Sequence, residues 1–286
     1  PHFHKQFRDL LFKVHRADSP CCASCAWGRE PGRCSLECFV SMRRIVESKA
    51  DELAAVIVEP LCQAAAGMRI YKAGYLSELA RVCRRNDVLL IVDEIATGFG
   101  RTGRMFAFQH AGIAPDIVCL GKALSAGYLP ISATVVKDAI YDTFDDKGED
   151  RTFYHGHTFA GNPIAAATAV EALAIYKEVG IVQQARRAGA VLEKEMAKLT
   201  GLPGVANVRC LGMIGAVELG RKGRPAADET GTGTAARVRK ALLVRGILVR
   251  PLGNVVYLMP PLVTPVDVLK NAVAELHAAI ADCLDD

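Results

Sequence analysis

One lysine and one aspartate stand where a sheet protein would hold a small molecule. Lys122 follows Gly121 at the end of the apolar run 117–120, and Asp93 ends the apolar run 88–92. Short runs of this kind predict strands that are buried on both faces of a parallel sheet. Ligands of such sheets bind at the carboxyl ends of the strands, so we expect the amine and the carboxylate to meet over one ligand.

The chemistry of this pair points to one cofactor. A lysine amine can form a Schiff base with an aldehyde and then transfer protons, and a carboxylate can keep a pyridine nitrogen protonated. Both roles are needed to hold pyridoxal phosphate (PLP), whose protonated ring withdraws electrons from an amino acid that loses its α-proton. Lys122 and Asp93 are therefore the predicted catalytic residues. Taken singly, they are also readable as a solvated lysine and an ordinary carboxylate at a strand end.

Two neighbouring segments are suited to the rest of such a site. The run Asp93–Gly103 is rich in glycine and threonine, which suits a tight loop beside a ligand. Gly156, His157 and Thr158 precede a helix start at Asn162. Backbone N–H groups and a hydroxyl at such a place can bind a phosphate, and a simple capping loop is the alternative.

Two arginines are expected to meet anionic partners. Arg250 stands in the otherwise apolar stretch 249–261. A buried arginine needs an anion, and its planar guanidinium matches a carboxylate. That carboxylate belongs either to a substrate or to an acidic residue of the protein. Arg101 is predicted to pair with Glu94 in a structural role.

The composition is that of a globular protein. The chain has 286 residues, of which 51% are hydrophobic and 23% charged, and its formal net charge is +4. The sequence has no dense block of lysine and arginine, so it does not predict nucleic-acid binding. It also has no apolar stretch of the roughly 20 residues that a membrane helix needs. The first residue is Pro1 rather than methionine. We therefore expect the chain to begin in mid-protein.

Five of the ten cysteines cluster near the start of the chain, at Cys21, Cys22, Cys25, Cys34 and Cys38. The spacing of the last four resembles that of zinc sites, but no histidine completes the set and Cys21 is surplus. We predict a loop of packed thiols without a metal, and a structural zinc ion is the alternative. The other five stand singly in apolar segments, as expected for core thiols of a reduced cytoplasmic protein.

The order of elements predicts an α/β fold with a mainly parallel sheet flanked by helices. The predicted strands cover residues 54–58, 88–92, 117–120 and 131–136, and the predicted helices cover 41–53, 75–85 and a long segment from Asn162 that breaks at Gly180. We predict a large domain over residues 1–180 and a smaller C-terminal α/β domain over 181–286. In the latter we expect two strands around Leu252–Asn254 and a last helix capped by Thr264.

Together these segments resemble the PLP-dependent aminotransferases of fold type I, subgroup III. The resemblance is carried by the segments Val58-Glu59-Pro60, Asp93–Gly103, Ala114–Ile117, Leu120–Leu124 and His155–Pro163. Within that family, the Gly156-x-Thr158 loop and the segment Arg250–Pro261 resemble the adenosylmethionine–8-amino-7-oxononanoate aminotransferases of biotin synthesis. The resemblance runs from about residue 53 to the end of the chain, and the cysteine cluster is similar to a feature of some members.

The resemblance implies a role for each residue around the cofactor. Lys122 would be the Schiff-base lysine and Asp93 the partner of the pyridinium nitrogen. His157 and Thr158 would contact the phosphate of the PLP bound in the neighbouring subunit of a homodimer. The active sites of the two subunits would then be shared.

The resemblance also implies the substrates. S-adenosylmethionine would donate the amino group, and 8-amino-7-oxononanoate would accept it to give 7,8-diaminononanoate. Gly156, Arg250 and Tyr257 would contact substrate, with Arg250 holding the far carboxylate of the acceptor.

Other interpretations remain open. Family members carry a further N-terminal portion with a phosphate loop and an aromatic residue that stacks on the cofactor. We do not find it here, and we expect these residues alone to bind PLP poorly. The chain could also belong to a related enzyme that acts on another ω-amine, or be a truncated, non-catalytic product. A nucleotide-binding protein is disfavoured because no Gly-x-Gly-x-x-Gly follows a strand.

Overall fold

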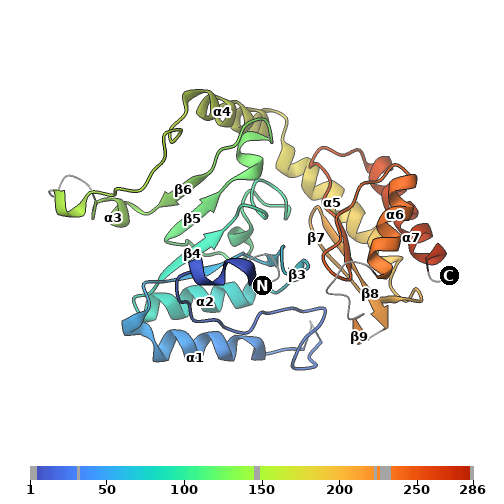
Figure 1. The fold of residues 1–286 in the computed structure, drawn as a ribbon, viewed down its shortest axis with the longest axis horizontal. Helices are drawn as coiled ribbons and strands as arrows, with labels where there is room; N and C mark the ends of the chain where they lie inside the picture. Colours follow the sequence, from blue (N-terminus) through green and yellow to red (C-terminus); the bar gives the residue numbers. More distant parts are fainter. Residues whose placement is uncertain (1–4, 31–32, 145–148, 222–223, 226–232, 284–286) are drawn as a thin grey trace.

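The computed structural model describes residues 5–30, 33–144, 149–221, 224–225 and 233–283. Its first sheet has the strand order β1-β4-β5-β6 (Figure 1). The four strands are β1 (Ala55–Val58), β4 (Leu89–Asp93), β5 (Ile117–Leu120) and β6 (Ala133–Val136). β1, β4 and β5 are parallel, and β6 runs antiparallel to β5. The predicted mainly parallel sheet is confirmed, with strand bounds shifted by two residues at most.

Two helices, α1 (Val40–Ser48) and α2 (Ala73–Arg85), lie on one side of this sheet (Figure 1). α2 buries Leu76, Leu79 and Cys83, which recur at helical spacing on one face. Each large aliphatic side chain buried in this way stabilises the fold by about 1.5–3 kcal/mol. This packing holds β4 in place. A short helix, α3 (Asp138–Tyr141), follows β6.

Two long helices, α4 (Pro163–Glu178) and α5 (Ile181–Ala197), lead from the first sheet to the second (Figure 1). Asn162 caps α4, because its Oδ1 accepts hydrogen bonds from the N–H groups of Ile164 (3.0 Å) and Ala165 (3.2 Å). Gly180 separates the helices with a φ of +66°, a left-handed conformation that favours glycine. The predicted helix start at Asn162 and break at Gly180 are both confirmed.

The second sheet is antiparallel and has the order β10-β8-β7, with β9 beside β8. Its strands are β7 (Val205–Leu211), β8 (Ile214–Arg221), β9 (Arg224–Pro225) and β10 (Val255–Leu258). It packs against α5, α6 (Thr234–Val244) and α7 (Val266–Asp282), which share one apolar core with it. None of the described helices has both the length and the hydrophobicity of a membrane span.

Two expectations for this region are wrong. Residues 247–251 do not form a strand beside β10. Instead Leu252 and Val255 exchange backbone hydrogen bonds of 2.9 and 3.0 Å around Gly253, so the chain turns too tightly to pair further. Thr264 does not cap α7, because its hydroxyl donates to the carbonyl of Pro261 at 2.7 Å, and the N-cap residue is Pro265.

A hairpin joins the two sheets. It consists of β2 (Cys62–Gln63) and β3 (Arg69–Ile70), and it packs against residues of β8 and β10. The buried guanidinium of Arg209 donates to the carbonyls of Gly67 (2.6 Å) and Met68 (2.8 Å) in the hairpin. The same group forms a 2.8 Å ion pair with Glu218 of β8. Arg209 therefore ties the hairpin to the second sheet.

We expect the substitution Arg209→Met to lower the free energy of unfolding by about 3–5 kcal/mol, because it leaves the mostly buried Glu218 carboxylate without a cation. Urea titration followed by circular dichroism measures the loss. The double variant Arg209→Met/Glu218→Gln removes the buried charge and should recover part of it. If Arg209→Met alone left the free energy of unfolding unchanged, the contacts of Arg209 would not be what holds the hairpin in place.

Candidate active site

Three ionisable residues lie at one edge of the first sheet. Glu59 follows β1, Asp93 ends β4, and Lys122 comes two residues after the last residue of β5. The three strands are parallel neighbours, so their carboxyl ends share one edge. The strand register sets Asp93 opposite Cys119 of β5. The amine and the carboxylate that the sequence singles out thus lie at the ends of adjacent strands, where ligands of such sheets bind.

The backbone at Lys122 is strained. Its φ is +45°, a left-handed conformation that a long side chain adopts at a cost of about 1–2 kcal/mol. A short 3₁₀ turn, Lys122–Ser125, holds it, and Leu124 of this turn is buried against α4. Strain of this kind is typical of sites where a side chain must point in one fixed direction.

The side chain of Lys122 is exposed, although the strand before it is apolar and the sequence favoured a buried amine at its end. The physical reason is its place beyond the end of β5, where a side chain leaves the sheet edge instead of entering the layer between sheet and helices. In this position the amine is accessible to a ligand.

Asp93 is held by its own loop. Its Oδ1 accepts a hydrogen bond from the N–H of Ile95 at 3.1 Å, which leaves the second oxygen for another donor. The loop then turns back so closely that a Cβ at Gly98 would lie 2.9 Å from the carbonyl oxygen of Glu94. Only glycine fits there without a shift of the backbone, in agreement with the tight loop expected from the sequence.

Glu94 is fully buried and structural, as predicted. Its carboxylate accepts hydrogen bonds from the hydroxyl of Thr97 (2.7 Å) and the N–H of Phe108 (2.8 Å). Burial raises the pKa of Glu94, and these hydrogen bonds oppose the shift. Through these hydrogen bonds, Glu94 stiffens the segment that begins at Asp93.

The expected ion pair between Glu94 and Arg101 is wrong. Arg101 instead donates to the carbonyls of Met213 (3.2 Å) and Pro260 (2.5 Å) in the C-terminal part of the chain. Burial lowers the pKa of Arg101 to about 10. The arginine therefore ties the loop after Asp93 to the second sheet.

The structure adds Glu59 to this edge, a residue that the sequence interpretation treated only as part of a family motif. Its Oε2 accepts a hydrogen bond from the N–H of Ala64 at 3.0 Å, and its carbonyl accepts one from the hydroxyl of Tyr71 at 2.6 Å. Burial raises the pKa of Glu59, the charge of Asp93 raises it further, and the charge of Lys122 lowers it. All three charges are thus close enough to interact. The position of Glu59 directly after a predicted strand was the signal in the sequence that could have identified it as a site residue.

The predicted phosphate loop lies apart from this edge. Gly156, His157 and Thr158 are exposed, and the stretch between α3 and α4 that carries them runs outside β6 (Figure 1). Nδ1 of His157 accepts a hydrogen bond from the N–H of Phe159 at 3.2 Å, which gives the loop a local turn. The fold of one chain does not bring these residues to Lys122.

The two predicted substrate residues of the C-terminal part lie near β10. Arg250 is exposed in the segment before this strand, so the expectation of a buried arginine is wrong. Tyr257 pairs with Ala216 in the sheet and packs against an apolar cluster that includes Cys62 of the hairpin after Glu59. Tyr257 therefore faces the segment that continues from the sheet edge, whereas Arg250 lies outside the core.

Comparison with known proteins identifies the family. Residues 1–280 match the family Aminotransferase class-III. The chain belongs to this family, and the match corrects the expectation that the resemblance starts near residue 53. No group of three or more His, Cys, Asp or Glu side chains within the described ranges is arranged to hold a metal ion.

Curated relatives and solved structures share both sequence and fold. The adenosylmethionine-8-amino-7-oxononanoate aminotransferase of Geobacter sulfurreducens is 40% identical over 97% of this chain and 62% of its own length. The crystal structure of the enzyme of that name from Methanocaldococcus jannaschii superposes with a TM-score of 0.88 at 36% identity, over 98% of this chain and 62% of the other.

A further solved structure is an amine transaminase from an uncultivated Pseudomonas species in its PLP-bound form. It has a TM-score of 0.86 at 34% identity, over 93% of this chain and 61% of the other. The chain thus spans about three fifths of the length of the relatives it matches.

Proposed function

We propose that the protein is a PLP-dependent aminotransferase that transfers the amino group of S-adenosylmethionine to 8-amino-7-oxononanoate and forms 7,8-diaminononanoate. The observation that carries the proposal is the arrangement of Asp93 and Lys122 at the ends of adjacent parallel strands. The names of the relatives that are up to 40% identical to the chain support the choice of substrates.

The residues at the sheet edge fit PLP. An accessible amine held in a strained backbone suits a covalent bond to the aldehyde of the cofactor. A carboxylate with one oxygen fixed by Ile95 and one oxygen available suits the protonated ring nitrogen. When bound, PLP supplies an electron sink that makes the Cα–H bond of an amino acid acidic.

Lys122 and Asp93 divide the chemistry between them. Nζ of Lys122 would hold the cofactor covalently and, when free, would carry the proton from the donor Cα to the cofactor. In the second half of the reaction it would deliver a proton to the carbonyl carbon of the acceptor. Asp93 would keep a proton on the ring nitrogen, and Glu94 holds the loop of Asp93 rigid from within the core.

We further propose a homodimer with shared active sites. The loop with Gly156, His157 and Thr158 is exposed and extends beyond the last strand of its own sheet. Such a loop can reach the cofactor of a second subunit, where His157 and Thr158 would bind the phosphate and Gly156 would contact substrate.

We also propose that the chain divides into two domains between residues 180 and 181, because Gly180 separates the helices that pack on the two sheets.

We propose that the enzyme is cytoplasmic. All ten cysteines are free thiols, which suits a reducing compartment.

Arg250 is the proposed anchor for the far carboxylate of 8-amino-7-oxononanoate, and Tyr257 a further substrate contact. We expect Arg250→Met to raise KM for this acceptor by about 100-fold, because one charge-assisted carboxylate contact is lost. KM for the amino donor should change little. Steady-state kinetics with each substrate varied in turn separates the two effects, and equal changes in both constants would contradict the assignment.

The choice of amino donor tests the proposed reaction. S-adenosylmethionine added without an acceptor should shift the absorbance of the PLP-loaded protein to that of its amine form. Glutamate and alanine should leave the spectrum unchanged. The second candidate is an amine or ω-amino-acid transaminase, which the likeness to the Pseudomonas amine transaminase favours. A shift with glutamate or alanine but not with S-adenosylmethionine would establish that candidate instead.

A further inference from the structure

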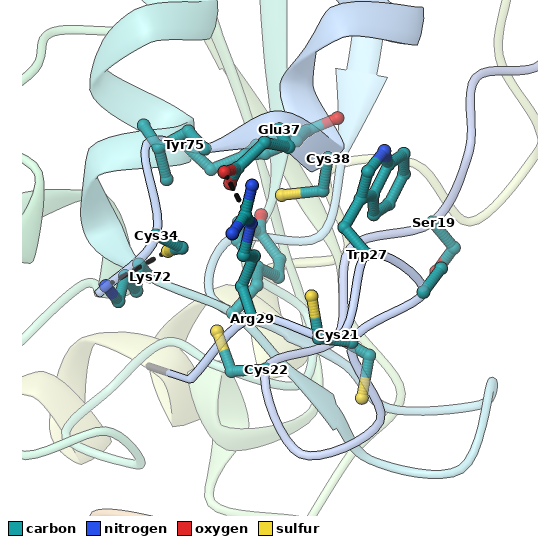
Figure 2. A pocket seen from close by; sticks show the side chains of 14 residues that line it. Ser19, Cys21, Cys22, Trp27, Arg29, Cys34, Glu37, Cys38, Lys72 and Tyr75 are labelled. Carbon is teal, nitrogen blue, oxygen red and sulfur yellow. Dashed lines mark hydrogen bonds and ion pairs between the residues drawn. The ribbon is translucent and has the colours of Figure 1, made fainter. Parts of the chain in front are cut away.

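The cysteine-rich segment near the start of the chain forms a small pocket against the beginning of α2 (Figure 2). Its cavity has a volume of about 30 Å³, and its lining includes Cys21, Cys22, Cys25, Cys34 and Cys38. All five are free thiols. A cavity of this size admits a molecule as small as water or hydrogen peroxide.

One thiol in this pocket is set apart by its partners. Nζ of Lys72 lies 3.2 Å from Sγ of Cys34, the contact drawn as a dashed line in Figure 2. The backbone N–H of Leu36 and the ammonium of Lys72 lower the pKa of Cys34. Glu37 opposes this shift, but its carboxylate is paired with Arg29 at 2.9 Å. Cys34 therefore has the surroundings of a reactive thiolate.

The neighbouring thiols differ from Cys34. Burial raises the pKa of Cys38 to about 11, and the charges of Cys22, Cys25 and Cys34 add to the shift. Burial also raises the pKa of Cys22, which the charge of Cys34 raises further. Cys22 and Cys38 thus hold their protons more tightly than Cys34 does.

Cys22 and Cys34 both lie near Lys72. The backbone N–H of Lys72 lowers the pKa of Cys22 against the larger effect of burial, and the ammonium of Lys72 lies 3.2 Å from the sulfur of Cys34. The N–H of Cys22 is itself bound to the carbonyl of Ile70 at 2.9 Å. The segment of Cys22 is therefore fixed to β3, and Cys34 is close enough for its charge to act on Cys22.

We propose that Cys34 is a thiolate that reacts with hydroperoxides and that Cys22 resolves the product as a disulfide. Its sulfur attacks an oxygen of the peroxide, and the O–O bond breaks. The alkoxide or hydroxide leaves and is protonated by solvent, so the peroxide is reduced and Cys34 becomes a sulfenic acid. The sulfur of Cys22 then attacks that of Cys34, the S–O bond breaks, and the proton of Cys22 leaves with the hydroxide as water.

This reaction fits the geometry better than metal binding, because the described residues contain no group of three or more ligand side chains arranged around one ion. The pocket also lies among residues that have no part in the proposed transamination. The thiol chemistry is therefore independent of the function proposed above.

The experiment follows the reaction of the reduced protein with hydrogen peroxide. After excess reductant is removed, peroxide is added, free thiols are alkylated, and tryptic peptides are analysed by mass spectrometry. Cleavage at arginine separates a peptide of residues 17–29, which carries Cys21, Cys22 and Cys25, from one of residues 34–43, which carries Cys34 and Cys38, and fragmentation of the linked peptides identifies the two bonded cysteines. The expected product is a disulfide between Cys22 and Cys34. In Cys22→Ser, dimedone should instead label Cys34 as the sulfenic acid.

Matched variants test the role of each group. Lys72→Met should slow the oxidation of Cys34 by about fivefold, whereas Lys72→Arg, which keeps the charge, should restore most of the rate. Cys38→Ser should change neither the rate nor the product. The proposal is overturned if Cys34 reacts no faster than Cys38, if the disulfide joins other cysteines, or if the purified protein holds one zinc ion per chain on these thiols.

Discussion

Replacement of Lys122 by alanine is expected to abolish transamination. The variant has no amine at the end of β5 to bond the cofactor aldehyde or to move the proton at the donor Cα, so kcat should fall by about 10⁴-fold or more. The absorbance of covalently bound PLP should disappear at the same time. Fixed-time assays of the 7,8-diaminononanoate formed measure the loss of activity, and an absorbance scan of the purified protein measures the loss of covalently bound PLP.

Lys177→Ala is the matched control, because Lys177 is an exposed lysine in the last turn of α4. It should keep both the absorbance band and the activity. Circular dichroism of both variants shows whether they are folded. A folded Lys122→Ala protein that retained the covalent band would show that another lysine binds the cofactor, and the proposed site would then be wrong.

The substitution Asp93→Asn is expected to lower kcat by about 10³-fold, because an amide cannot hold a proton on the ring nitrogen as a carboxylate does. The side chain keeps its size and can still accept the hydrogen bond from Ile95. Fold and cofactor attachment should therefore survive. Single-turnover kinetics with the amino donor measures the loss in the proton-transfer step.

Asp138→Asn serves as the control for this change, since Asp138 is an exposed carboxylate at the start of α3. Its activity should equal that of the unmodified protein. If Asp93→Asn reduced activity only by weakening cofactor attachment, saturating PLP would restore the rate, and Asp93 would be a binding residue without the proposed electronic role.

Much of the fold could be predicted because its signals are local. The apolar runs that end at Val92 and Leu120 became β4 and β5, and Asn162 capped the helix that the sequence placed after it. Errors arose where a local signal competed with a tertiary contact. Thr264 donates to Pro261 instead of capping α7. Arg101 donates to two distant carbonyls instead of pairing with Glu94.

The candidate site divides in the same way. The sequence placed Asp93 and Lys122 directly after strands, but it could not state which strands are neighbours. The pairing of β1 with β4 and of β4 with β5 brings Glu59 to the same edge. The sequence also could not predict the positive φ of Lys122, because this backbone conformation is fixed by a turn that packs on α4, a helix some 40 residues further along the chain.

The sequence by itself determined the class of fold, the residue types at the sheet edge and the family, since these depend on apolar patterns and on motifs of adjacent residues. Only the tertiary structure decided which charges meet, that Lys122 is exposed, and that Cys22 and Cys34 share one lysine. The physical reason is that strand order and side-chain contacts result from packing between segments far apart in the chain, which no local pattern specifies.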